Sequence, residues 1–262
     1  MPGSPSSITR TGKTEPWELQ VSRGQISWHQ PVVIFGYNSD INGSVETVWP
    51  HGGILGFPSS AIQLSVSSGS ADDTALGTGA RTVYLEGLDA NYNTISEIVT
   101  LSGQTAVTTT KSYLHINSCY VLSAGSGNSA AGTIYFGTGV VTAGVPATVY
   151  DVIQFDYNSR ITGSYTIPAG YTGYVSQGLF SSGQASGTGP VTGRLMTRGT
   201  NNIRMTAAVT TVNNGAADYA FEYPLVVPQK TTIEAQATGT GNNNACSSLF
   251  VVVLIKNDAG VP

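Results

Sequence analysis

The amino-acid sequence predicts an all-β chain made of two β-sandwich or jelly-roll-like units behind an extended N-terminal arm. Only 10% of the 262 residues are charged and 32 are glycine, whereas exposed helices are normally built from Lys, Glu, Gln, Arg and Ala. Short runs rich in Val, Ile, Thr and Tyr alternate between apolar and polar residues, the period of a strand with one buried face. Clusters of Gly, Asn, Asp and Ser separate these runs, as they do between the strands of a sandwich.

Residues 1–40 are expected to form the arm. They begin with Pro, Gly, Ser and Thr and show no clean apolar period, although Val32-Val-Ile-Phe35 could be one strand. Such a segment either frays at the surface or embraces a neighbouring subunit.

Residues 41–158 are expected to form the first unit, with one half-buried strand followed by two hairpins. The predicted elements are the strand 61–66, the hairpin 81–88 and 93–103 around the turn 89–92, and the hairpin 113–122 and 132–137 around the loop 123–131.

Residues 159–262 are expected to form the second unit, because the strand pattern restarts after Asn158-Ser159. Its last run, 249–255, has seven consecutive apolar residues and predicts a central strand covered on both faces. The other predicted elements are a strand–turn–strand over 162–175 and a hairpin formed by 203–210 and 219–223 around the turn 213–215.

Motifs that would carry chemistry are missing from the sequence. His29, His51 and His115 do not stand in metal-ligand spacing, and no Gly-x-Ser-x-Gly elbow is present. Asp72 and Asp73 are adjacent carboxylates, but glycosidases place their acidic pair across a cleft, and adjacent acids more often solvate a turn or occasionally bind a divalent cation. We therefore expect no enzymatic activity, no cofactor and no metal site.

Charge and hydropathy restrict the partners. The net charge of −4 gives no reason to expect nucleic-acid binding. No apolar run approaches the roughly 18–20 residues that cross a bilayer, and no basic segment followed by an apolar one marks a secretory signal. We expect neither a nucleic-acid nor a membrane partner, and synthesis in a cytoplasm.

Five residues are candidate contacts with partners. Arg194, Arg198 and Arg204 fall close together in a half that carries six basic and four acidic residues, and they either meet an acidic partner or lie solvated on loops and strand edges. Trp49 and Tyr171 stand in aromatic clusters that either stack on a sugar or fill a core or subunit interface.

The two cysteines, Cys119 and Cys246, each lie in or beside an apolar strand run. Two cysteines do not make a disulfide framework, and the sequence leaves open whether they pair.

A resemblance adds to this interpretation. Over roughly residues 40–256, an ordered set of short motifs resembles virion structural proteins of tailed bacteriophages. The motifs are Val45-Glu-Thr-Val-Trp-Pro-His-Gly-Gly53, Asp73-Thr-Ala-Leu-Gly-Thr-Gly-Ala-Arg-Thr-Val83, Gly87-Leu-Asp-Ala-Asn-Tyr92, Ser96-Glu-Ile-Val-Thr-Leu101, Ser123-Ala-Gly-Ser-Gly-Asn128, Ala131-Gly-Thr-Ile-Tyr135 and Tyr165-Thr-Ile-Pro-Ala-Gly-Tyr-Thr-Gly-Tyr174.

The resemblance implies a particle component without catalytic residues. A capsid decoration or cement protein is the first expectation, with a tail or fibre part or a carbohydrate-binding receptor module as the alternative. The implied partners are further copies of the chain, in a homo-oligomer expected to be a trimer, and the major capsid protein or other virion proteins. The implied location is the virion, assembled in the bacterial host cytoplasm.

Overall fold

A computed structural model describes residues 6–8, 14–184, 189–241 and 243–257, and it confirms the all-β class. Within these residues it contains one helix, of six residues. The elements in chain order are β1 (Ser6–Ile8), β2 (Thr14–Pro16), α1 (Trp17–Ser22), β3 (His29–Ile41), β4 (Glu46–Thr47), β5 (Ile62–Ser68), β6 (Ala80–Leu88), β7 (Thr94–Thr100), β8 (Val107–Tyr113), β9 (His115–Ala124), β10 (Ile134–Thr142), β11 (Val145–Ile153), β12 (Ser164–Thr166), β13 (Tyr171–Gln184), β14 (Val191–Arg198), β15 (Arg204–Val212), β16 (Gly215–Val227), β17 (Thr232–Gly239) and β18 (Asn244–Lys256).

The first unit comprises β5 to β11. One sheet has the order β11-β10-β5-β8 and the other the order β7-β6-β9. Apolar side chains from both sheets form one buried cluster, which includes Leu64 and Phe136 from the first sheet and Val83, Leu85 and Cys119 from the second. Burial of this apolar surface is the main term that holds the two sheets together.

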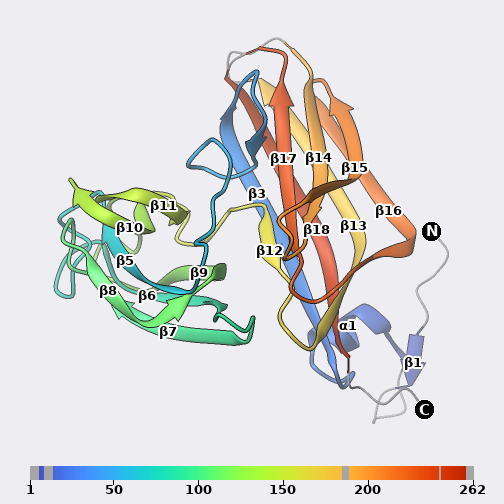
Figure 1. The fold of residues 1–262 in the computed structure, drawn as a ribbon, viewed down its shortest axis with the longest axis horizontal. Helices are drawn as coiled ribbons and strands as arrows, with labels where there is room; N and C mark the ends of the chain where they lie inside the picture. Colours follow the sequence, from blue (N-terminus) through green and yellow to red (C-terminus); the bar gives the residue numbers. More distant parts are fainter. Residues whose placement is uncertain (1–5, 9–13, 185–188, 242, 258–262) are drawn as a thin grey trace.

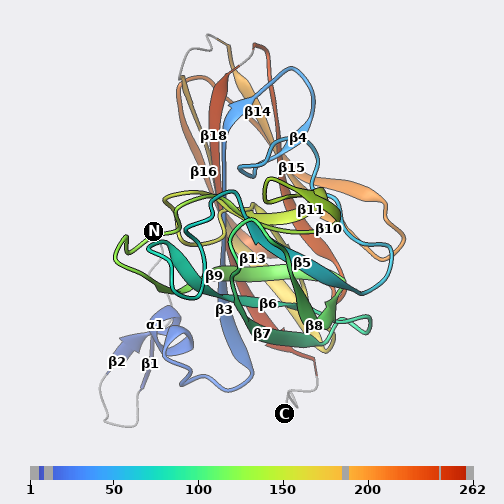
Figure 2. The ribbon, with the colours of Figure 1, turned by 90° about the vertical axis from the view of Figure 1, so that its left-hand side faces the viewer.

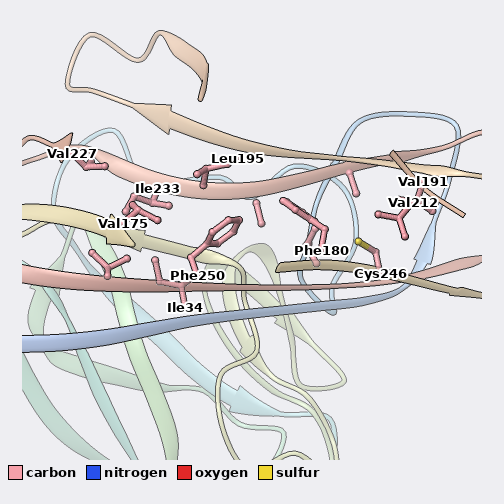
Figure 3. Close-up of a cluster of buried hydrophobic side chains, with 14 of the residues drawn as sticks. Ile34, Val175, Phe180, Val191, Leu195, Val212, Val227, Ile233, Cys246 and Phe250 are labelled. Atoms are coloured by element: carbon pink, nitrogen blue, oxygen red, sulfur yellow. The ribbon is translucent and has the colours of Figure 1, made fainter. Parts of the chain in front are cut away.

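The second unit is built from β3, β4 and β12 to β18. The sheet β16-β13-β18-β3 faces the sheet β12-β17-β14-β15, and β4 pairs with β17. Figure 3 shows the side chains between the two sheets, where Phe180 and Phe250 meet edge to face at 5.5 Å between ring centroids and lie near Leu195. As predicted, the apolar run 249–255 lies in a central strand, because β18 pairs with β13 on one side and with β3 on the other.

The predicted arm needs a correction over residues 29–40. The structure places them in β3, a strand of the second unit that is paired with β18 from His29 to Ile41. The apolar run Val32–Phe35 supplies the reason, because Ile34 is 3% exposed and packs into the buried apolar cluster between the sheets of the second unit, which we call the second cluster. The chain therefore begins the second unit before it enters the first, and Figure 1 shows the blue strand β3 beside the red strand β18.

The hairpin predicted at 81–103 is confirmed. β6 and β7 pair from Thr82↔Thr100 to Leu88↔Thr94, and the side chain of Asp89 accepts the amide hydrogens of Asn91 and Asn93 in the turn.

The hairpin predicted over 113–137 is wrong in its pairing. Its two strands exist as β9 and β10, but β9 pairs with β6 whereas β10 pairs with β5 and β11. The intervening loop carries the chain from one sheet to the opposite one, and the amides of Gly125 and Gly127 bond to the carbonyls of Gly79 and Thr78 on the way.

The hairpin predicted around 213–215 is wrong for the same reason. β15 pairs with β14 and β16 pairs with β13, so the turn connects the edge strands of opposite sheets. Val212, next to the turn, is 7% exposed and belongs to the cluster between the sheets.

The two units meet along the segment that connects them. Main-chain bonds join Val121 to Asn158 and Arg160 to Cys119 on the β9 side, and the amide of Tyr37 in β3 donates to the carbonyl of Ile161 at 3.0 Å. Viewed from the side of the first unit, Figure 2 shows its strands in front of β3.

Candidate functional site

The three candidate arginines lie on two paired strands, and two of them come together. Arg198 at the end of β14 stands opposite Arg204 at the start of β15. Both lie near the fully buried carboxylate of Glu234 on β17, whose Oε2 is 3.7 Å from Nε of Arg204. Arg194 lies farther along β14 and donates from Nη1 to the hydroxyl of Thr238 at 2.7 Å. The three side chains therefore do not form one open basic patch.

Glu234 is the centre of this polar cluster. Its Oε1 accepts a hydrogen bond from the hydroxyl of Thr47 at 2.7 Å and another from Nε2 of Gln236 at 2.9 Å. A buried carboxylate is retained only where donors and positive charge compensate its lost hydration. Arg204 is thus the ion-pair partner of Glu234, whereas Arg198 is close enough to feel the carboxylate's charge but leaves its buried Nη2 without a hydrogen-bond partner among the described residues.

Arg198 also links the two units. Its guanidinium lies over the ring of Phe57 at 4.1 Å, and Phe57 in turn packs on His115 of the first unit at 4.6 Å between centroids. Burial lowers the pKa of Arg198, although the Glu234 carboxylate acts in the opposite direction. Burial, with a smaller effect of Arg198, lowers the pKa of His115 to about 4. The guanidinium of Arg198, stacked on Phe57, and the neutral imidazole of His115 therefore lie where the two units meet.

The two candidate aromatic residues differ in exposure. Trp49 is 2% exposed, and its Nε1 donates to the carbonyl of Gly53 at 3.1 Å. Its indole is therefore part of the interior and not a platform for a sugar. Tyr171, the first residue of β13, is half-buried and packs against the second cluster.

A surface that the sequence analysis did not single out lies on β15 and β16. We call it the β15–β16 flank; Figure 1 shows these strands on the side of the second unit remote from the first unit. Its large apolar side chains are solvent-exposed: Ile203 (60%), Met205 (66%), Val209 (55%), Tyr219 (37%), Tyr223 (85%) and Val226 (57%).

The alternating pattern of 203–223 could have indicated this flank. The sequence predicts a single hairpin here, with one apolar and one polar face, but the two strands are edges of two different sheets. Several of their apolar side chains are exposed to solvent.

A second surface feature is a crevice of about 390 Å³ where the units meet. It is bounded by residues 30–35 of β3, by 117–120 of β9 and by the connecting segment 159–165. Glu86 and Arg160 are its charged residues, and Nε of Arg160 is 2.5 Å from Oδ2 of Asp151.

Reactive and metal-binding groups give no alternative site in the part of the chain that the structure describes. Within that part, no group of three or more His, Cys, Asp and Glu side chains is placed to hold a metal ion. Both cysteines are free and buried, one in each unit's cluster, and burial raises the pKa of Cys246 to about 12. Over the same residues, no helix is long and apolar enough to cross a membrane.

Comparisons with known proteins give only distant likenesses. No family model matches the chain, and no curated protein matches it. A structure of the Gx strain of infectious bursal disease virus aligns over 89% of this chain and 74% of its own at 12% identity and a TM-score of 0.25. The PBSX exported protein XepA aligns over 94% and 98% at 12% identity and a TM-score of 0.19. The VP2 subviral particle of infectious bursal disease virus aligns over 88% and 73% at 11% identity and a TM-score of 0.22. Scores this low assign the chain to no family.

Proposed function

We propose that the chain is a non-enzymatic structural protein of a bacteriophage virion, a capsid decoration or cement protein that stabilises the head shell through subunit contacts. In this proposal each facing pair of sheets acts as a rigid β-sandwich unit. The observation that carries the proposal is the β15–β16 flank, a set of exposed apolar side chains on two edge strands of a chain with only 10% charged residues. Few charges must be desolvated when such a surface docks.

The size of the flank suits a weak contact that is repeated. Burying a large apolar side chain is worth about 1.5–3 kcal/mol when it starts fully exposed, so the six partly exposed side chains of the flank supply roughly 5–10 kcal/mol. Association costs roughly 4–15 kcal/mol in lost freedom. One such contact is therefore marginal by itself, whereas symmetric repetition over a shell makes it effective.

The proposed partners follow from this mechanism. The flank would contact further copies of the chain, in a trimer, and the major capsid protein or other virion proteins beneath it. The proposed location is the surface of the virion, after assembly in the host cytoplasm.

Copy number in purified particles tests the proposal. Mass spectrometry should count hundreds of copies for a decoration protein, and cryo-electron microscopy should place them at capsid symmetry axes. A dozen copies or fewer, located at the tail, would assign the protein to the tail or a fibre instead. Absence from particles would contradict the virion role altogether.

A variant pair tests the flank itself. Tyr223→Ser combined with Val226→Ser should reduce the occupancy of particles, because both side chains are exposed and their loss leaves the core intact. Leu76→Ser is the matched control, since Leu76 is 91% exposed but belongs to the first unit. Equal occupancy for the flank variant and the control would exclude the flank as the contact.

A further inference from the structure

The outer edge of β3 carries main-chain groups without partners. β3 is the last strand of its sheet and pairs only with β18. The carbonyl of Trp28 accepts from the amide of Lys256, whereas the amide of Tyr37 donates away from β18, to Ile161. Because hydrogen bonding alternates along an antiparallel strand, even-numbered residues bond to β18 and odd-numbered ones point outward.

Three consecutive outward positions line the crevice between the units. Pro31, Val33 and Phe35 present their carbonyl groups there, and the latter two also present amides. Among the described residues, these amides have no hydrogen-bond acceptor. Proline has no amide hydrogen and is tolerated at an outer edge, which agrees with the orientation of Pro31.

The side chains around this edge suit a strand-like occupant. Val33 is 62% exposed, Phe35 is 41% exposed and Tyr120 on the opposite wall is 38% exposed. The crevice volume of about 390 Å³ lies within the range of ligand sites, roughly 300–1,000 Å³. The rest of the lining is largely polar. Exposed apolar side chains beside free peptide groups are the arrangement with which a sheet edge receives an added strand.

One acidic and one basic side chain, Glu86 and Arg160, line the crevice. The charge of Arg160 is compensated by its ion pair with Asp151, and its Nη1 donates to the carbonyls of Thr162 and Ser164 at 3.1 and 2.6 Å, whereas its Nη2 is buried and has no hydrogen-bond partner among the described residues. Glu86 is the charged side chain left over, and its carboxylate accepts only the hydroxyl of Tyr84 at 3.0 Å among the described residues. A basic side chain of an occupant would complement it.

We propose that the crevice binds an extended peptide segment of a partner protein, which adds to β3 as a further strand. The segment has small or β-branched uncharged side chains and one Lys or Arg that faces Glu86. Its main chain bonds to the outward groups of Val33 and Phe35. This proposal stands independently of the virion role, because it rests on the strand edge and the crevice alone.

Binding of a synthetic probe to the full chain tests the proposal. The probe is a fluorescein-labelled peptide that repeats Thr-Val and carries one central Lys, and its binding is followed by fluorescence anisotropy. We expect saturable binding with a Kd below about 1 mM. Methylating alternate peptide nitrogens on one edge of the probe should weaken binding at least tenfold, whereas methylating the other edge should have little effect. Equal effects of the two methylated probes, or no saturation, would overturn the proposal without any protein variant.

Protein variants then locate the site. Val33→Pro removes one outward amide and leaves the bonds to β18 in place, so it should weaken binding about tenfold at an unchanged Tm. Val33→Thr keeps that amide and is the matched control. Glu86→Gln should weaken binding of the Lys probe but not of a probe with Gln in its place. If Val33→Pro and Glu86→Gln both bind like the unmodified protein, the probe binds elsewhere and the proposal fails.

Discussion

Asp73 is expected to hold the first unit together, and Asp73→Ala tests this. The carboxylate is fully buried. It accepts hydrogen bonds from the hydroxyl of Ser68 and from the amides of Ala80, Ala131 and Gly132, the amides at 2.6, 2.8 and 3.0 Å. One side chain thus fastens the end of β5, the start of β6 and the loop before β10.

The magnitude follows from the donors that the substitution leaves behind. A buried donor without an acceptor costs about 1–3 kcal/mol, so losing all four bonds should lower the free energy of unfolding by about 4 kcal/mol or more. A domain is stable by only about 5–15 kcal/mol. Asp73→Ala should therefore bring the first unit close to unfolding.

The assay must distinguish the two units. The three tryptophans, Trp17, Trp28 and Trp49, lie outside β5 to β11, so tryptophan fluorescence in urea reports the second unit and its surroundings. Hydrogen exchange measured by mass spectrometry on peptides from 62–153 reports the first unit. We expect faster exchange across the first unit and a smaller effect on the fluorescence transition.

Asp72→Ala is the matched control for this prediction. Asp72 is the neighbouring residue and is exposed, and surface substitutions usually change stability by less than about 0.5 kcal/mol. If Asp73→Ala changed the stability of the first unit by no more than the control does, the four hydrogen bonds of the Asp73 carboxylate would not stabilise the first unit as inferred.

Three further predictions concern the junction, the second core and the thiols. Burial lowers the pKa of His115 to about 4, from an ordinary value of 6.5, so between these values the unfolded chain binds more protons than the folded chain. The free energy of unfolding should therefore fall as the pH falls from about 6.5 to about 4, and His115→Gln should weaken this dependence in urea titrations at several pH values; an unchanged pH dependence would contradict the assignment. A Cβ added at Gly36 would meet main-chain atoms of two neighbouring segments at 2.5 and 2.7 Å, so Gly36→Ala should destabilise the second unit by about 1–3 kcal/mol in tryptophan-detected unfolding, whereas Gly43→Ala, with open space around it, should not. Burial raises the pKa of Cys119 and of Cys246, so neither thiol should react with a thiol reagent such as Ellman's in the native protein and both should react in denaturant; rapid reaction of the native protein would show that a cluster opens.

Strand positions were largely predictable from the sequence, whereas strand partners were not. Alternation assigns each residue to a face of its strand, which located β5, β6 and β7 within a few residues, and the apolar run 249–255 located the second half of β18. The alternating pattern of a strand does not show which other strand pairs with it. The loop before β10 and the turn at 213–215 look like hairpin connections, yet both carry the chain from one sheet to the opposite sheet.

The polar cluster shows a second limit of the pattern. Ile233, Ala235 and Ala237 alternate with polar residues in the sequence, and all three are buried in the core of the second unit. Glu234 and Gln236 on the other face are also buried, at 0% and 4% exposure. Alternation normally indicates a strand with one buried and one solvent-exposed face. The local sequence does not show that a distant segment covers the polar face of β17.

The pairing of β3 with β18 has a consequence for synthesis of the protein. Strand β3 is synthesised about 200 residues before β18, the strand that pairs with it at residues 244–256. The intervening first unit contains both of its own sheets, so it can fold during translation as an independent body. Until residues 244–256 have been made, the apolar residues of β3 lack the strand that pairs with them. We therefore expect chaperones to bind nascent chains at β3. A chain that terminates before β18 should expose this strand permanently.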